Sequence, residues 1–154
     1  MNELRITCHN VPAMNQDSID KVRALESFSS ANLIQIPMDT FHIIHGGMYA
    51  RTIMVPAGIM VTGVLIRVAT ILIVQGHTIV YVGDGSVEYN GYHVLPASAG
   101  RKTAVFAKSD TYYTFIYPTS KKNIHDAEEE FTDEADLLFS RKNPASNHII
   151  ITGE

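Results

Sequence analysis

The sequence has one cysteine, no tryptophan and no surplus of positive charge among its 154 residues. Cys8 alone can form neither an intrachain disulfide nor a Cys-based zinc site, so we interpret it as a small, half-buried residue. An intermolecular disulfide or a reactive thiol is the alternative. The 12 Lys and Arg residues stand against 16 Asp and Glu residues, which leaves a formal net charge of −4. Proteins that bind nucleic acid normally need a basic face, so we expect no nucleic-acid partner.

Long apolar runs are also absent. The longest run, Val64–Val74, is interrupted by Arg67 and is far shorter than the roughly 20 apolar residues of a membrane-spanning helix. Its content of Val, Ile and Thr predicts a long strand that is buried on both faces. The N-terminal residues Met1–Asn15 are polar and predict no secretory signal. We therefore expect no membrane partner, and the length and the ordinary share of apolar residues predict one globular domain.

The chain divides into three parts by composition. Residues 1–33 form an N-terminal arm in which apolar residues spaced by three predict a short helix over Asp17–Phe28, with Asp17 or Ser18 as its N-cap. Residues 34–118 are rich in strand-forming residues. Residues 119–154 form an acidic tail, in which we expect helices over Asn123–Glu130 and Thr132–Arg141. A terminal strand, His148–Thr152, is expected to add to the edge of its own sheet or of a neighbour's sheet.

The central part contains short strand-like runs separated by turn residues. The expected strands are 48–55, 59–61, 64–74, 77–82, 86–89, 92–95, 101–107 and 111–117. The turns between them include Gln75-Gly76, Gly83-Asp84-Gly85 and Asn90-Gly91, of which the last two are typical of hairpins. No helical period separates these strands, so the sheet is expected to be antiparallel. A sandwich, a jelly roll or a small barrel would close such a sheet.

The order of a set of residues in this central part resembles a known family. The set is His42, Gly47, Tyr49-Ala50-Arg51, Pro56-Ala57-Gly58, Gly63, Pro96 and Gly100. Residues in this order resemble the cupin family, and more narrowly the small cupin-like proteins of tailed phages, to which the acidic stretch 128–141 is also similar. The resemblance implies an all-β fold with peripheral helices: a cupin-type antiparallel jelly roll or β-barrel, with a short N-terminal helix and C-terminal helices.

The chain departs from the family at the metal-binding positions. Counted from Gly58, the two histidines of the first motif would fall near Val64 and Ile66, and its glutamate near Thr70 or Ile71. The histidine of the second motif would fall near Thr103. Alkyl groups and hydroxyls are poor ligands where transition metals need imidazole or carboxylate. The resemblance therefore implies that the metal site is lost, and we expect no metal and no cofactor.

Five residues are candidates for a ligand site: His42, His45, Tyr49, Arg51 and Arg67. On a strand, His42 and His45 would point to opposite faces, but on a turn they could share a ligand; a polar turn without a ligand is the alternative. Tyr49 and Arg51 share one strand face. Arg51 and Arg67 could bind an anion at the barrel mouth, and a structural ion pair or an interface contact is the alternative.

Three hypotheses for function follow. The first, which we favour, is a non-enzymatic phage accessory or structural protein that self-assembles, or docks on a virion or a host protein, in the host cytoplasm or on the particle. The second is a small-molecule binder, or a metal-free isomerase or epimerase, that uses the barrel mouth and a base–acid set. Candidates for that set are His77, Tyr81, Tyr92, His93, Asp110, Tyr112 and Tyr113, for which core packing is the alternative. The third is a metalloenzyme with relocated ligands, drawn from His42, His45, His77 or His93.

Overall fold

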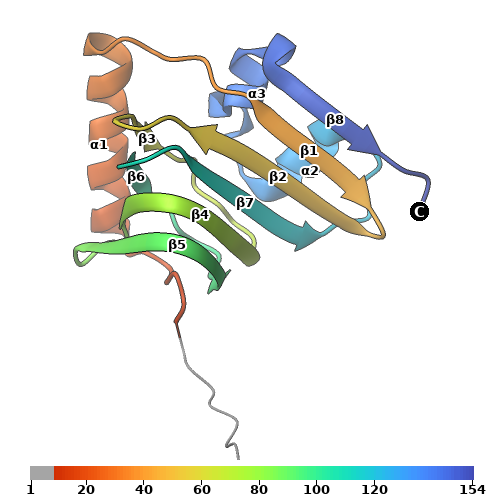
Figure 1. The fold of residues 1–154 in the computed structure, drawn as a ribbon, viewed down its shortest axis with the longest axis horizontal. Coiled ribbons are helices and arrows are strands. Elements are labelled where there is room, and N and C mark those ends of the chain that lie inside the picture. Colours follow the sequence, from red (N-terminus) through yellow and green to blue (C-terminus); the bar gives the residue numbers. More distant parts are fainter. Residues whose placement is uncertain (1–8) are drawn as a thin grey trace, which may run out of the picture.

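A computed structural model describes residues 9–154 of the chain, so the predictions for Cys8 and for the rest of residues 1–8 lie outside the described part. The eight strands form one sheet that curls into a half-barrel, with helices at both ends of the chain (Figure 1). The strands are β1 Thr40–His45, β2 Met48–Val55, β3 Met60–Thr62, β4 Thr70–Tyr81, β5 Ser86–Ala97, β6 Ala104–Ala107, β7 Thr111–Pro118 and β8 Asn147–Ile151. The predicted class, mainly β with peripheral helices, is confirmed.

The order of strands across the sheet is β3-β6-β4-β7-β2-β1-β8, and β5 pairs with β4 outside this path. Strand β4 pairs with β5 along its whole length. On its other side it pairs with β7 at residues 71–75 and with β6 at residues 78–81. Strand β8 adds to β1 at the edge of its own sheet, and this is the one parallel pair between strands of the described chain. The expectation of an antiparallel sheet therefore holds for the other strand pairs.

Strand β4 corrects two predictions. The expected strand over Val64–Val74 is wrong, because β4 begins at Thr70 and runs through Gly76, where a turn was expected. The expected burial on both faces is also wrong: Leu72 and Val74 are buried, whereas Ile71 is half exposed. Gly76 bends the strand instead of reversing it, since its φ of +141° is open to glycine.

Strand β5 corrects a third prediction. Asn90-Gly91 makes no hairpin, and the strand continues through Pro96 to Ala97. Gly91 faces Gly76 in the register of the β4–β5 pair, so the two glycines, both at positive φ, lie at the same level of the two strands. The other hairpin, Gly83-Asp84-Gly85, is confirmed, with the Val82 amide donating to the Gly85 carbonyl.

Strand β1 was not among the predicted strands. Its sequence, TFHIIH, places His42 at an inward position, so the apolar–polar alternation that marks a half-buried strand is lost. Gly46 and Gly47, both at positive φ, form the tight connection from β1 to β2. His42 and His45 therefore lie on opposite faces of a strand and do not share a turn.

Helix α1 (Gln16–Asn32) confirms the predicted N-terminal helix and extends it. The cap is Asn15, not Asp17 or Ser18, because the Asn15 side chain accepts from the Ser18 amide. The helix packs on the sheet through an ion pair in which the fully buried Lys102 Nζ donates to Glu26 Oε2 at 3.1 Å. The same ammonium donates to Glu134 Oε2 at 2.8 Å, which also joins the tail to the barrel.

The tail folds against the concave side of the sheet. Helix α2 (Ile124–Phe131) confirms the first predicted tail helix. The second, over Thr132–Arg141, is wrong: it is broken into a 3₁₀ turn, Ala135–Leu137, and the short helix α3, Phe139–Lys142. The break lies at Leu138, whose backbone is extended (φ −66°, ψ 139°) and whose side chain is buried in the core. None of the helices in residues 9–154 is long and apolar enough to cross a membrane.

The core lies on the concave side in two main clusters. One cluster is made by inward residues of the strands, among them Val55, Leu72 and Val74. The other joins the strands to the tail: Tyr49 and Tyr117 from the sheet pack with Phe131. The concave side is thus covered by the chain's own C-terminal residues.

Candidate functional site

Three of the four positions that the cupin resemblance would use for a metal line a small cavity, whereas neither Thr70 nor Ile71 does. Val64, Ile66 and Thr103 line it, together with Arg51 and Phe131, and its volume is about 60 Å³. Pockets for small molecules are usually about 300 Å³ or larger. The lining offers alkyl and phenyl groups, two threonine hydroxyls and a cationic guanidinium, so this donor set does not fit a divalent metal ion. Residues 9–154 contain no cluster of three or more His, Cys, Asp or Glu side chains that suits a metal.

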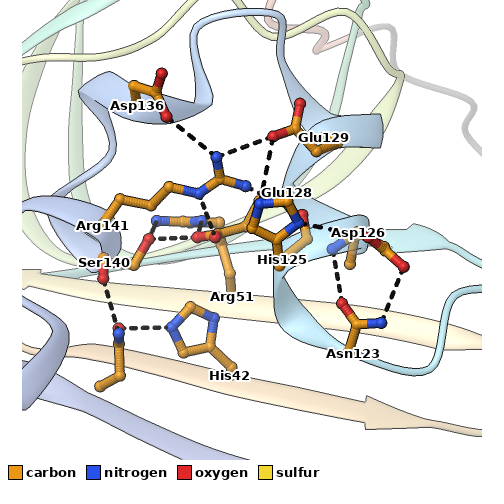
Figure 2. A network of polar contacts seen from close by, with 12 residues as sticks. His42, Arg51, Asn123, His125, Asp126, Glu128, Glu129, Asp136, Ser140 and Arg141 are labelled. Atoms are coloured by element: carbon orange, nitrogen blue, oxygen red, sulfur yellow. Dashed lines mark hydrogen bonds and ion pairs between the residues drawn. The ribbon is translucent and has the colours of Figure 1, made fainter.

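Arg51 lies at the floor of this cavity and forms a buried ion pair. Its Nη1 donates to Glu128 Oε2 at 3.0 Å, and both side chains are almost fully buried. Its guanidinium carbon lies 5.5 Å from the centre of the Phe131 ring. Figure 2 shows the carboxylate of Glu128 between Arg51 of β2 and Arg141 of α3. Two cations from different elements thus share one buried carboxylate, which fixes α2 and α3 to the sheet.

The carboxylate of Glu128 has further donors. The hydroxyl of Ser140 donates to Oε2, and Arg141 Nε donates to Oε1 at 3.2 Å. Arg141 also pairs with Glu129 at 2.9 Å and donates to the carbonyl of His125 at 3.1 Å. The buried charge is therefore satisfied on both oxygens, as a charge in a core must be.

His42 belongs to a second chain of hydrogen bonds beside this pair. Its Nδ1 lies 2.6 Å from the hydroxyl of Tyr49, and its Nε2 lies 2.9 Å from Asn147 Oδ1. Asn147 Nδ2 donates to the Ser140 carbonyl at 2.8 Å, which leaves Oδ1 as the acceptor. His42 therefore carries its proton on Nε2, and Nδ1 accepts from Tyr49. This chain connects β2, β1, β8 and α3.

Burial sets the protonation states of His42 and Tyr49 in this series of hydrogen bonds. It lowers the pKa of His42, because the charged imidazolium is disfavoured away from water. It raises the pKa of Tyr49 to about 12, because the phenolate is disfavoured for the same reason. Both groups are neutral at physiological pH and serve the hydrogen bonds described above.

The shift of His42 predicts a loss of stability in mild acid. The unfolded chain binds the proton at the ordinary pKa of 6.5, while the folded chain resists it, so the free energy of unfolding falls below that pH by up to about 1.4 kcal/mol per pH unit. Urea unfolding of the wild type at pH 7.5 and 5.5 should show this loss. His42→Gln should reduce the difference, and the exposed His45→Gln is the matched control that should retain it. Equal pH dependence in the wild type and His42→Gln would contradict the assignment.

The structure brings together three of the five predicted site residues. His42, Tyr49 and Arg51 lie inward on β1 and β2. His45 lies on the outer side, where its Nδ1 is 2.7 Å from the Thr152 hydroxyl. Arg67 is half exposed and pairs with Asp133 and with backbone carbonyls of α2. The assignment of these five residues to a ligand site stays a prediction.

The other candidates are scattered. His77 Nε2 lies 2.5 Å from Glu88, and His93 Nε2 lies 2.9 Å from the Asn90 carbonyl. The hydroxyl of Tyr113 lies 2.5 Å from that of Thr78 inside the core. The partners that matter most, Glu128 and Asn147, were not predicted. The only signal for Glu128 was Arg51 itself, for which a structural ion pair was one of the alternatives.

The opposite, convex side of the sheet carries a second surface, which we call the outer face. Strand register aligns its side chains in rows across β8, β1, β2, β7, β4 and β5. The first row is Ile150, Ile43, Ala50, Ile116, Ile71 and Pro96; the second is His148, Phe41, Thr52, Thr114, Ile73 and Val94; the third is Met54, Tyr112, Gln75 and Tyr92. None of these positions holds Asp, Glu, Lys or Arg, and many of the large side chains are 40% or more exposed.

No protein-family model matches this chain, and no curated protein matches it. Several solved structures are similar to it. A cupin superfamily protein from Desulfitobacterium hafniense is 17% identical, with a TM-score of 0.47, over 58% of this chain and 87% of that one. The Cupin_2 domain of an XRE family transcriptional regulator from Enterobacter cloacae is 12% identical, with a TM-score of 0.45, over 54% and 99%. The plu4264 protein from Photorhabdus luminescens is 13% identical, with a TM-score of 0.46, over 94% and 99%. These similarities concern the fold alone.

Proposed function

We propose that this protein is a non-enzymatic structural module that acts through assembly, as an accessory protein of a phage particle. The observation that carries the proposal is the covered concave side of the half-barrel. Where the resembled family keeps an open, ligand-lined cavity, this chain has a remnant of about 60 Å³ lined mainly by alkyl side chains.

The tail supports this proposal by the way it is held. Phe131 and Leu138 pack into the sheet's own core. The ion pair of Arg51 and Glu128 binds α2 to β2 beneath them. Moving α2 off the sheet to open the interior would break this buried pair, and leaving either charge unpaired in the core costs several kcal/mol. The interior therefore serves to hold the tail in place.

The role in a phage particle comes from the sequence resemblance. The series of motif residues from His42 to Gly100 and the acidic stretch 128–141 resemble those of small tailed-phage proteins. This resemblance suggests the phage particle or a host protein as the larger partner. A closed core and an uncharged outer face suit a protein whose work is done by its surface.

Native mass spectrometry of the untagged protein tests the proposal. We expect masses that are whole multiples of the chain mass, with no stoichiometric metal or organic adduct. Addition of Zn²⁺, Mn²⁺ or Fe²⁺ should leave the melting temperature unchanged, because alkyl side chains offer no ligand bond that would favour the folded state. A stoichiometric adduct, or a clear metal-dependent rise in melting temperature, would overturn the proposal and favour a binder or enzyme acting at the barrel mouth.

A further inference from the structure

We infer that the outer face is the contact between two copies of this chain. The inference rests on the proposed function, and it names a second copy of this chain as the partner in assembly. Figure 1 looks onto this face: β1, β2 and β7 lie in front, and α2 lies behind them. In residues 9–154, the three main helices pack away from these rows: α1 packs against Ala104 of β6 and Tyr81 at the end of β4, and α2 and α3 lie on the concave side. The rows of the outer face are therefore left uncovered by the described chain.

The composition of the face is that of a contact surface. Phe41, Met54, Tyr92 and Tyr112 stand on it among Ile, Val, Thr and Pro side chains. Centres of protein interfaces are enriched in aromatic residues and Met and depleted of Lys, Glu and Asp. Isolated exposed apolar residues are ordinary, whereas contiguous apolar patches above a few hundred Å² mark interaction sites. The rows are contiguous because register places each side chain beside the next.

The size of the face fits a dimer. The 16 positions of the three rows, at a strand spacing of about 4.8 Å and a row spacing of about 7 Å, cover roughly 540 Å² in projection. The side chains that stand on this area raise its accessible surface toward the about 800 Å² that each partner contributes to a standard interface. A small peptide would cover only part of it.

Charge favours a second copy as the occupant. Each copy carries a formal net charge of −4, so two copies repel each other wherever their acidic surfaces meet. The outer face has no carboxylate in its rows, so two such faces can meet without a like-charge contact. A two-fold axis makes the contact isologous, so the same three rows of both copies form the contact. An uncharged apolar face is complementary to a second copy of itself, whereas a face that carried charges of one sign would repel its copy.

Sedimentation velocity at several concentrations tests the inference, with native mass spectrometry as the second measurement. We expect the wild type to be a dimer, and Ile43→Lys and Ile71→Lys each to be a monomer at concentrations where the wild type is dimeric. Both positions are more than 40% exposed, so the folded monomer tolerates lysine there, and near-wild-type circular dichroism and urea unfolding at a concentration where the wild type is monomeric should confirm it. The matched controls are Ile34→Lys, an exposed apolar residue away from the sheet, and Ile149→Lys, on the edge strand β8 beside the concave side.

The outcomes separate the inference from the proposed function. A wild-type dimer that persists in both Ile43→Lys and Ile71→Lys overturns the inference, and its loss in Ile149→Lys would place the contact at the β8 edge instead. A wild type that is still monomeric at about 100 µM also overturns it. In each of these cases the proposed function is still tested by the adduct and metal measurements, which do not depend on the outer face.

Discussion

Glu128→Gln is expected to lower the free energy of unfolding by about 3–5 kcal/mol. The substitution keeps the shape of the side chain but removes the charge on which Arg51 and Arg141 converge. Arg51 would then be a buried cation whose hydrogen-bond partners are all neutral, namely the amide oxygen of the new side chain and the Ser140 hydroxyl at 3.4 Å. Urea unfolding, monitored by circular dichroism, measures the loss.

The neighbouring residue provides the matched control. Glu129 pairs with the same Arg141 but is half exposed, so Glu129→Gln should cost no more than about 1 kcal/mol. A double variant, Arg51→Met with Glu128→Leu, replaces both charges with apolar groups and should be more stable than Glu128→Gln alone. A similar small effect for Glu128→Gln and Glu129→Gln would show that the tail does not depend on the buried pair.

Gly76→Ala is expected to destabilise the fold by about 3 kcal/mol or more, or to prevent folding. A Cβ at this position would lie 2.5 Å from the Thr111 hydroxyl and 2.8 Å from both the Asp110 carbonyl and the Thr111 Cα. Two of these atoms belong to the backbone and cannot move without shifting β7. The φ of +141° adds the strain of a conformation that L residues rarely adopt.

Gly91→Ala is the control for the backbone strain alone. Gly91 faces Gly76 across the strand pair, has a φ of +97°, and would place an added Cβ in open space, with no atom within 4 Å. We expect a loss of about 1–3 kcal/mol there, measured by the same urea titration. If Gly91→Ala were as damaging as Gly76→Ala, backbone conformation and not the close approach of β7 would explain the requirement for glycine.

Local patterns were sufficient to predict the elements that depend on neighbouring residues. Apolar spacing predicted α1, and Gly83-Asp84-Gly85 predicted its hairpin. Gln75-Gly76 and Asn90-Gly91 look the same as turns in the sequence, but each lies opposite the other in a continuous strand pair. Whether a glycine reverses a strand or bends it depends on the partner strand, which no local pattern contains.

The candidate site shows the same limit. Strand alternation predicted that Arg51 shares a strand face with Tyr49, and the structure shows that this face is buried. Its partner Glu128 lies 77 residues away in an acidic run, where local composition predicted a helix but no contact with Arg51. The outer face was missed for a similar reason. Ile43, Ile116 and Ile71 lie in one row only because the register of three strand pairs aligns them.

Strand β4 has a consequence for how the molecule opens. Its first half pairs with β7 and its second half with β6, while β5 follows it throughout. Neither β6 nor β7 can therefore separate from the β4–β5 pair without breaking backbone hydrogen bonds of β4. The backbone amides of β4 should be the last to exchange with deuterated solvent, at the rate of global unfolding. The edge strand β8, which is held by β1 alone, should exchange much earlier.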